Sequence, residues 1–340
     1  MTAVRHPEPV EVDLAIIGAG PSGLYGAYYA GFRGLRVAVL DSLSEPGGQV
    51  TALYPEKPIY DIAGLPAVRG RDLISALLEQ GAPFEPQYLL GDQVTTLTEA
   101  GSTFALGTAR GRQIRCRAVL VTGGIGTFSP RPLPEGEPFV GRGLMYFVPS
   151  LQALADQDVL VVGGGDSAFD WALALEPLAR SVTLVHRRAA FRAHQHTVDS
   201  VLASSVRVAA PARVERFHGN GQVAAVDIRH VTEERTETLP VQSVVAALGF
   251  TADLGPLTSW GIDIRNRHIV VDSRMRTSRA GIYAAGDITE YDGKVRLISV
   301  GFGEAATAVN NAVTYLHPDA DLFPGHSSDA APPVPVASPA

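Results

Sequence analysis

The chain has 340 residues and a net charge of −7, with 46% hydrophobic and only 19% charged residues. This length predicts two domains, because a single domain typically has ~150 residues. The acidic balance argues against a nucleic-acid-binding protein, which presents a basic surface, and no apolar run reaches the ~18 residues of a membrane span.

Cys116 is the only cysteine, which excludes an intramolecular disulfide, a CxxC motif and a cysteine-rich zinc site within one chain. It falls in the strand-like apolar run 114–121, where we expect it to be a buried small hydrophobe. The first 13 residues contain no apolar core of signal-peptide length. We therefore expect a cytoplasmic protein with no metal site, no membrane contact and no nucleic-acid partner.

The stretch from Asp13 to Asp41 has the order strand, glycine turn, helix, strand and acid. Gly18, Gly20 and Gly23 stand in GxGxxG spacing, in which the first permits a tight turn, the second lets a pyrophosphate approach, and the third lets the helix pack on the strand. Asp41 follows the second strand, where a carboxylate accepts hydrogen bonds from a ribose. The pattern predicts a site for FAD or NAD; the alternative is a glycine turn without a ligand.

The next 100 residues contain weaker signals. Residues 42–66 are rich in glycine, proline and aromatic residues, which indicates a functional irregular segment. Residues 70–80 have the spacing of an amphipathic helix, and residues 88–121 favour short antiparallel strands. Residues 126–149 are full of proline and glycine and predict a linker into a second unit.

A second copy of the first pattern follows at a constant offset of 145 residues. Gly18, Gly20, Gly23 and Asp41 correspond to Gly163, Gly165, Ala168 and His186. Strands are expected at 159–162 and 182–185, with a helix from about residue 167 to Pro177. Two dinucleotide-binding units are therefore predicted.

The copies differ at the ribose position, where the second has basic residues in place of the acid. Arginine binds phosphate through bidentate charged hydrogen bonds, so this copy should prefer NADPH, with its 2′-phosphate, over NADH. The alternative is a solvated basic turn. The candidate NADPH-binding residues are Gly163, Gly165, Asp166, Ser167, Ala168, His186, Arg187, Arg188 and Arg192.

The chain after the second repeat has further strand and helix patterns and ends in a tail without them. Strands are expected between residues 206 and 248, and another should end at Gly286 and Asp287. Residues 302–316 have the spacing of a helix. From Ser327 onward the composition predicts a mobile tail.

The motifs GAGPSG, GGGDSA with HRRAAFRAH, and AAGD occur in the order typical of thioredoxin-reductase-like flavoproteins with two dinucleotide-binding domains. The chain resembles that family. The resemblance implies an α/β fold of two Rossmann-like three-layer domains, with the NADPH domain (123–249) inserted in a discontinuous FAD domain (1–122 and 250–328). Residues 329–340 would form a disordered tail.

One departure from thioredoxin reductase bears on function. In that enzyme a redox-active CxxC follows the GRG motif, whereas here residues 141–143 are followed by LMYFV. The segments PGGQVTALYPEKPIYDIAG and PGHSSD instead resemble the thioredoxin-reductase-like class of ferredoxin–NADP+ reductases, which are typically homodimers. By this resemblance Tyr54 would stack on the flavin, and His326 would cover its other face. The implied FAD contacts, with the residues of the first turn, are Gly18, Gly20, Ser22, Gly23, Asp41, Gln49, Tyr54, Val94, Phe128, Asp287 and Ser328.

The implied reaction passes electrons from NADPH through FAD to a one-electron carrier, ferredoxin or flavodoxin, and requires no side chain as acid or base. Two alternatives stay open: a disulfide reductase or oxidase without a CxxC, and a non-catalytic flavoprotein that senses NADPH. We also expect the carrier to dock on a basic surface. Its candidate residues are Lys57, Arg69, Arg71, Lys294 and Arg296.

Overall fold

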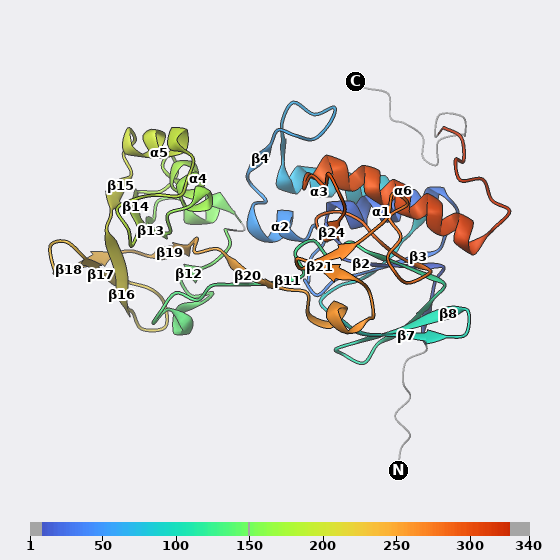
Figure 1. Ribbon diagram of the computed structural model, residues 1–340. Coiled ribbons are helices and arrows are strands. Elements are labelled where there is room, and N and C mark those ends of the chain that lie inside the picture. Colours follow the sequence, from blue (N-terminus) through green and yellow to red (C-terminus); the bar gives the residue numbers. More distant parts are fainter. Residues whose placement is uncertain (1–8, 149, 327–340) are drawn as a thin grey trace, which may run out of the picture. The chain divides into compact units, whose positions relative to one another are not determined.

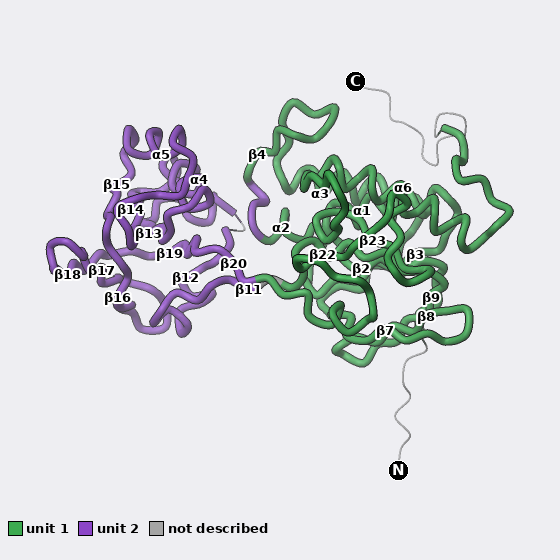
Figure 2. Tube along the Cα trace, viewed as in Figure 1, with its two compact units in different colours: residues 1–52, 57–127, 252–340 green, residues 53–56, 128–251 purple. Residues whose placement is uncertain are grey.

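A computed structural model describes residues 9–148 and 150–326 of the chain. The chain forms two compact units, coloured separately in Figure 2. Unit 1 comprises residues 1–52, 57–127 and 252–340, and unit 2 comprises residues 53–56 and 128–251. The predicted fold, with one α/β unit inserted in the other, is confirmed, whereas the assignment of each domain to a cofactor stays a prediction. No described helix is long and apolar enough to cross a membrane.

A five-stranded parallel sheet forms the centre of unit 1, with the strand order β23-β10-β2-β3-β6. Its inner strands are short apolar runs buried on both faces, as expected when other layers cover both sides of a parallel sheet. The strands are β2 (Leu14–Ile17), β3 (Val37–Leu40), β6 (Gln87–Leu89), β10 (Ala118–Val121) and β23 (Ile282–Ala284).

Three helices cover one face of this sheet, and Figure 1 shows them together above β2 and β3. Helix α1 (Pro21–Phe32) packs between α3 (Gly70–Gly81) and α6 (Ile298–Leu316). On the other side lies the sheet β1-β9-β8-β7, whose strands are β1 (Val10–Glu11), β7 (Val94–Ala100), β8 (Thr103–Thr108) and β9 (Gln113–Cys116). Unit 1 therefore has three layers.

Small elements complete unit 1. They are α2 (Gln49–Leu53), the hairpin of β4 (Pro58–Ile59) and β5 (Val68–Arg69), and the sheet of β21 (Ile264–Arg265), β22 (His268–Val270) and β24 (Thr289–Glu290). The chain passes between the units in strands β11 (Thr127–Pro130) and β20 (Phe250–Asp253), which pair with each other.

Unit 2 repeats the layered plan around a second parallel sheet, in the order β12-β19-β13-β14-β15. Unit 2 has two hydrophobic cores, one on each face of this sheet, because successive side chains of β13 point to opposite faces. Val159 and Val161 face the helices, while Leu160 and Val162 face the antiparallel sheet. The elements are β12 (Leu144–Met145), β13 (Asp158–Val162), β14 (Ser181–Val185), β15 (Arg207–Ala209), β19 (Ser243–Ala246), α4 (Asp166–Leu175), α5 (Gln195–Leu202), β16 (Ala212–His218), β17 (Ala225–His230) and β18 (Arg235–Pro240).

Most predicted elements are present, and the errors have physical reasons. The helix expected at 70–80 is α3, and the helix expected at 302–316 begins earlier, at Ile298. The apolar run 114–121 is not one strand: it divides at Arg117 into the end of β9 and β10, which belong to different sheets. The segment 126–149 is more than a linker, because Leu144 of β12 is fully buried in the core of unit 2.

Candidate dinucleotide-binding sites

The first glycine turn lies between β2 and α1. Gly18 has a φ of +115°, and a β-carbon there would collide with the carbonyl of Thr122. A β-carbon at Gly23 would collide with the carbonyl of Gly18. Gly20 is different, because no atom lies within 4 Å of the position its β-carbon would occupy. Gly18 and Gly23 are therefore needed by the fold, whereas Gly20 leaves open the space that a bound pyrophosphate would use.

Asp41 lies beside this turn at the end of β3. Its carboxylate accepts hydrogen bonds from the main-chain N–H of Ala19 at 2.7 Å and of Leu43 at 2.9 Å. Burial raises the pKa of Asp41, and these two amides oppose the rise. A buried carboxylate is stabilised by additional hydrogen-bond donors, and the hydroxyls of a ribose would supply them.

Other segments of unit 1 converge on the same turn. The N–H of Gly47 donates to the carbonyl of Ala19 at 2.7 Å, so the PGGQ segment lies against the turn. The hydroxyl of Thr122, directly after β10, donates to the carbonyl of Gly18 at 2.7 Å. Added β-carbons at Gly286 and Gly301 would both crowd the Ser22 hydroxyl, so α1, the loop after β23 and α6 meet at Ser22.

Asp287 follows Gly286 in that loop and is partly exposed. Burial raises its pKa, and the positive charges of Lys294 and Arg296 oppose the rise. The main-chain N–H of Gly286 donates to Glu304 at 2.7 Å, so a carboxylate from α6 holds the loop at the residue before Asp287. This geometry suits a side chain that must point reliably at a ligand.

Lys294 is not part of a docking surface, contrary to the sequence-based hypothesis. Its side chain is only 2% exposed, and its ammonium lies 2.5 Å from Glu304 Oε1. The pair is buried because Glu304 itself lies on the inner face of α6, where it also accepts a hydrogen bond from Tyr291. Two other docking candidates are partnered, since Arg69 pairs with Asp72 and Arg296 with Glu290.

The second glycine turn, in unit 2, has the same division of roles as the first. A β-carbon at Gly163 would lie 2.5 Å from the carbonyl of Ala247, and Ala168 packs against this position. No atom lies within 4 Å of the β-carbon position of Gly165, the counterpart of Gly20. The correspondence between the two copies therefore extends from sequence spacing to the space left open for a ligand.

His186 occupies the position of Asp41, and its ring lies where a β-carbon at Gly164 would have to go. Burial lowers the pKa of His186, and the three nearby arginines lower it further. Its Nε2 is buried without a hydrogen-bond partner among the described residues. A buried polar atom of this kind fits a bound group that would supply the missing partner.

The three candidate arginines follow His186 on an exposed loop. Within the part of the chain that the structure describes, the side chains of Arg187, Arg188 and Arg192 have neither a salt bridge nor a hydrogen bond. Asp166 and Ser167 lie in the first turn of α4 and are exposed, while Ala168 is buried. Unpaired guanidinium groups beside an open glycine turn are available to a phosphate.

The remaining predicted FAD contacts are more scattered. Gln49 begins α2, with its amide group next to Gly124. Val94 is buried at the start of β7, and Tyr54 lies in the short segment grouped with unit 2. The side chain of Phe128 and all of Ser328 lie outside the described residues. His326 is exposed, with its ring 5.2 Å from that of Phe323.

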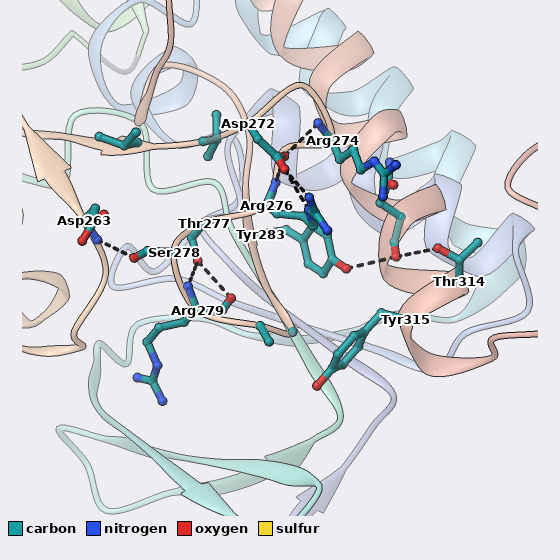
Figure 3. A pocket seen from close by; sticks show the side chains of 15 residues that line it. Asp263, Asp272, Arg274, Arg276, Thr277, Ser278, Arg279, Tyr283, Thr314 and Tyr315 are labelled. Atoms are coloured by element: carbon teal, nitrogen blue, oxygen red, sulfur yellow. Dashed lines mark hydrogen bonds and ion pairs between the residues drawn. The ribbon is translucent and has the colours of Figure 1, made fainter.

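A cavity of about 640 Å³ opens elsewhere in unit 1. Figure 3 shows its lining around Asp272, which accepts hydrogen bonds from the main chain of Arg274 and from Arg276, and around Tyr283, which donates to α6. It borders Gly281, at the opposite end of β23 from Gly286. None of the predicted cofactor residues lines it.

Residues 12–312 match the pyridine nucleotide-disulphide oxidoreductase family. The ferredoxin–NADP reductase of Salinispora arenicola is 62% identical over 321 residues, which cover 94% of this chain and 99% of that protein. The chain belongs to this family and, within it, to the ferredoxin–NADP reductases. The ferredoxin–NADP reductase of Salinispora tropica is also 62% identical, over 94% of this chain and 99% of its own.

The family assignment agrees with the fold. The thioredoxin reductase of T. acidophilum matches with a TM-score of 0.72 over 91% of this chain and 99% of its own. Its sequence is only 23% identical, so this likeness concerns the fold alone. The resemblance to the thioredoxin-reductase-like class of ferredoxin–NADP+ reductases, inferred from the sequence motifs, is thus confirmed.

Sequence reasoning missed two residues that hold the first site. Thr122 was not among the candidate residues, although its hydroxyl donates a hydrogen bond to the carbonyl of Gly18 in the turn. Glu304 was overlooked, although it is the only acid on an apolar helix face that includes Gly301, Ala305 and Ala308. An acid at a buried helical position was the signal that could have revealed it.

Proposed function

We propose that the protein is a flavoenzyme that passes electrons between NADPH and a one-electron carrier protein, ferredoxin. The observation that supports this most directly is the pair of glycine turns, each with an open second position, one followed by an acid and the other by basic residues. The high identity to proteins named ferredoxin–NADP reductase supports the same activity.

In unit 1 the first turn would hold the pyrophosphate of FAD, where Gly20 leaves room and the first amides of α1 face the anion. Asp41 would accept the ribose hydroxyls, and Asp287 would hydrogen-bond the ribityl chain. Bound FAD supplies the conversion between a two-electron hydride transfer and single-electron transfers. The remaining FAD contacts, including stacking by Tyr54 and cover by His326, belong to the same proposal.

In unit 2 the second turn would hold the pyrophosphate of NADPH beside Gly165. Arg187, Arg188 and Arg192 would bind the 2′-phosphate, because their side chains are exposed and have no salt bridge within the described residues. His186 would complete that subsite with its buried Nε2. The chain therefore needs to orient two cofactors and exclude water from the transfer, and no acid or base from a side chain is required.

A disulfide reductase is disfavoured by the chemistry of the single thiol. Cys116 is 1% exposed at the end of β9, and burial raises its pKa to about 12. A thiol that stays protonated cannot attack a disulfide, because the thiolate is the nucleophile. The absence of a second cysteine also removes any dithiol relay within one chain.

The proposed oligomeric state, second carrier and cellular location are inferred from the sequence. A homodimer and flavodoxin as a second carrier follow from the resemblance to the family class. A cytoplasmic location is supported by the lack of any possible intramolecular disulfide in a chain with one cysteine.

Two reciprocal substitutions test the cofactor assignment. Gly20→Ala should fold, since its methyl group enters open space, but should lose bound FAD and its yellow absorbance. Gly165→Ala should keep FAD and raise the KM for NADPH. Each variant is the control for the other unit, and Gly18→Ala should fail to fold. Normal FAD content in Gly20→Ala would refute the first site.

The activity itself is tested with the wild-type holoenzyme. NADPH should bleach the FAD absorbance rapidly, and cytochrome c should then be reduced only after ferredoxin is added. Bleaching followed by oxygen consumption without any carrier requirement would indicate an oxidase. Slow or absent bleaching in the presence of tight NADPH binding would indicate a sensor.

A further inference from the structure

The loop that contains the arginines is attached to the second glycine turn at two points. The main-chain N–H of Arg192 donates to the carbonyl of Gly164 at 2.7 Å. The main-chain N–H of His194 donates to Asp166 Oδ1 at 2.8 Å. The first attachment uses only main-chain atoms, so Asp166 is the side chain through which the turn holds the loop; the His186 side chain also hydrogen-bonds to the main chain of Ala190 within the loop.

The two copies of the glycine turn use opposite attachments. In unit 1 the acid lies on the loop: Asp41 accepts from the N–H of Ala19 in the turn. In unit 2 the loop residue is His186, whose ring packs over Gly164. In unit 2 the acid lies in the turn instead: it is Asp166, and the corresponding residue of unit 1 is Pro21.

A carboxylate at this position is not explained by pyrophosphate binding. Asp166 is the first residue of α4, so its negative charge lies close to where a bound pyrophosphate would meet the helix N-terminus. Like charges in such proximity oppose binding. Its hydrogen bond to the loop supplies the reason for an acid there.

We propose that Asp166 is a positioning residue that holds the loop 187–194 so that its arginines face the 2′-phosphate, and thereby contributes to the preference for NADPH over NADH. The proposal rests on the proposed NADPH site in unit 2. In this proposal Asp166, which the sequence places among the candidate NADPH-binding residues, acts through the loop and not by direct contact with the nucleotide.

The alternative role for Asp166 is to stabilise α4 through the helix dipole. An acid in the first turn is favourable for any helix, and Asp72 occupies this position in α3. A helix-stabilising role would affect the binding of every nucleotide to unit 2 equally. A loop-positioning role would affect only nucleotides with a 2′-phosphate.

The test measures Kd values of the FAD-loaded enzyme for 2′,5′-ADP and for 5′-AMP by calorimetry. Asp166→Ala should weaken 2′,5′-ADP about tenfold relative to 5′-AMP, the loss typical for one hydrogen bond to a charged group. His194→Pro removes the donor of the same hydrogen bond, and the φ of −57° at His194 suits proline. His194→Ala, which keeps the N–H, is the matched control and should leave the ratio unchanged.

The double variant Asp166→Ala, His194→Pro decides whether the two groups act through one interaction. Its ratio should equal that of either single variant, because the second change removes nothing further. Additive losses, or an Asp166→Ala ratio within twofold of the wild type, would overturn the proposal. A wild-type enzyme that binds both ligands equally would refute the NADPH assignment itself.

Discussion

The buried pair of Lys294 and Glu304 offers a demanding test of the geometry around the Gly286 turn. The two side chains are 2% and 5% exposed, and the charged atoms are 2.5 Å apart. In Lys294→Met the carboxylate stays buried with only neutral donors, which are the N–H of Gly286 and the hydroxyls of Tyr291 and Thr289. Removing one partner of a buried pair costs about 3–5 kcal/mol, and because these donors remain we expect about 3 kcal/mol.

A second substitution should reverse most of this loss. In Lys294→Met, Glu304→Gln the side-chain carbonyl still accepts from Gly286, but no charge is left unpaired in the interior. Neutral replacement of a buried ion pair is often close to neutral for stability. The exposed pair of Arg69 and Asp72, with side chains 58% and 47% exposed, is the control: Arg69→Ala should cost under about 1 kcal/mol.

Urea unfolding, followed by flavin fluorescence and circular dichroism, measures these effects on unit 1. With a slope of ~1–3 kcal/mol per molar urea, a loss of about 3 kcal/mol lowers the midpoint by roughly 1 M or more. The flavin-releasing transition is the relevant one, because a protein of two units need not unfold in one step. A Lys294→Met midpoint equal to that of Arg69→Ala, or a double variant no more stable than the single, would refute this reasoning.

The thiol of Cys116 should react with Ellman's reagent at pH 8 only after unfolding, since burial raises its pKa to about 12; rapid reaction of the native protein would contradict its burial. Hydrogen bonds from Arg207 lower the pKa of Glu237 from 4.5 to about 2, so the stability from its ionised form is complete above pH 4.5 and is lost as the pH falls toward 2. Glu237→Gln should therefore show a weaker loss of stability over that range in urea titrations, and an unchanged loss would count against the pairing. Gly164→Ala should displace the His186 ring and weaken NADPH binding while FAD content stays normal; an unchanged Kd for NADPH would show that the ring position does not matter.

The two glycine turns and their parallel sheets could be predicted because their signals are local. A short apolar strand, a first glycine that has no room for a β-carbon and a helix that begins after an open second glycine all lie within about ten residues. The constant offset between the copies reinforced the prediction. The structure adds that, among the motif glycines of the two turns, Gly20 and Gly165 have open space at the β-carbon position, which the spacing alone does not reveal.

The errors arose where tertiary contacts override local preference. Lysine is usually exposed, and nothing near Lys294 in the sequence indicates that it forms a buried ion pair with Glu304. The early start of α6 at Ile298 was missed because its first turns contain Gly301 and β-branched residues, which disfavour a helix in isolation. Packing against α1 supplies the stability that the local sequence lacks.

In the NADPH site that we propose in unit 2, nucleotide preference would depend on residues 164, 166 and 186 together. Asp41 can accept from Ala19 because a carboxylate is small, whereas the His186 ring requires the glycine at position 164. With the acid gone from the loop, Asp166 makes the connection from the other side. His186→Asp alone would place a ribose acceptor in the site yet leave the arginine loop held in place. From the proposed site we therefore expect that an exchange of NADPH for NADH preference needs a change in the loop attachment together with the change at position 186.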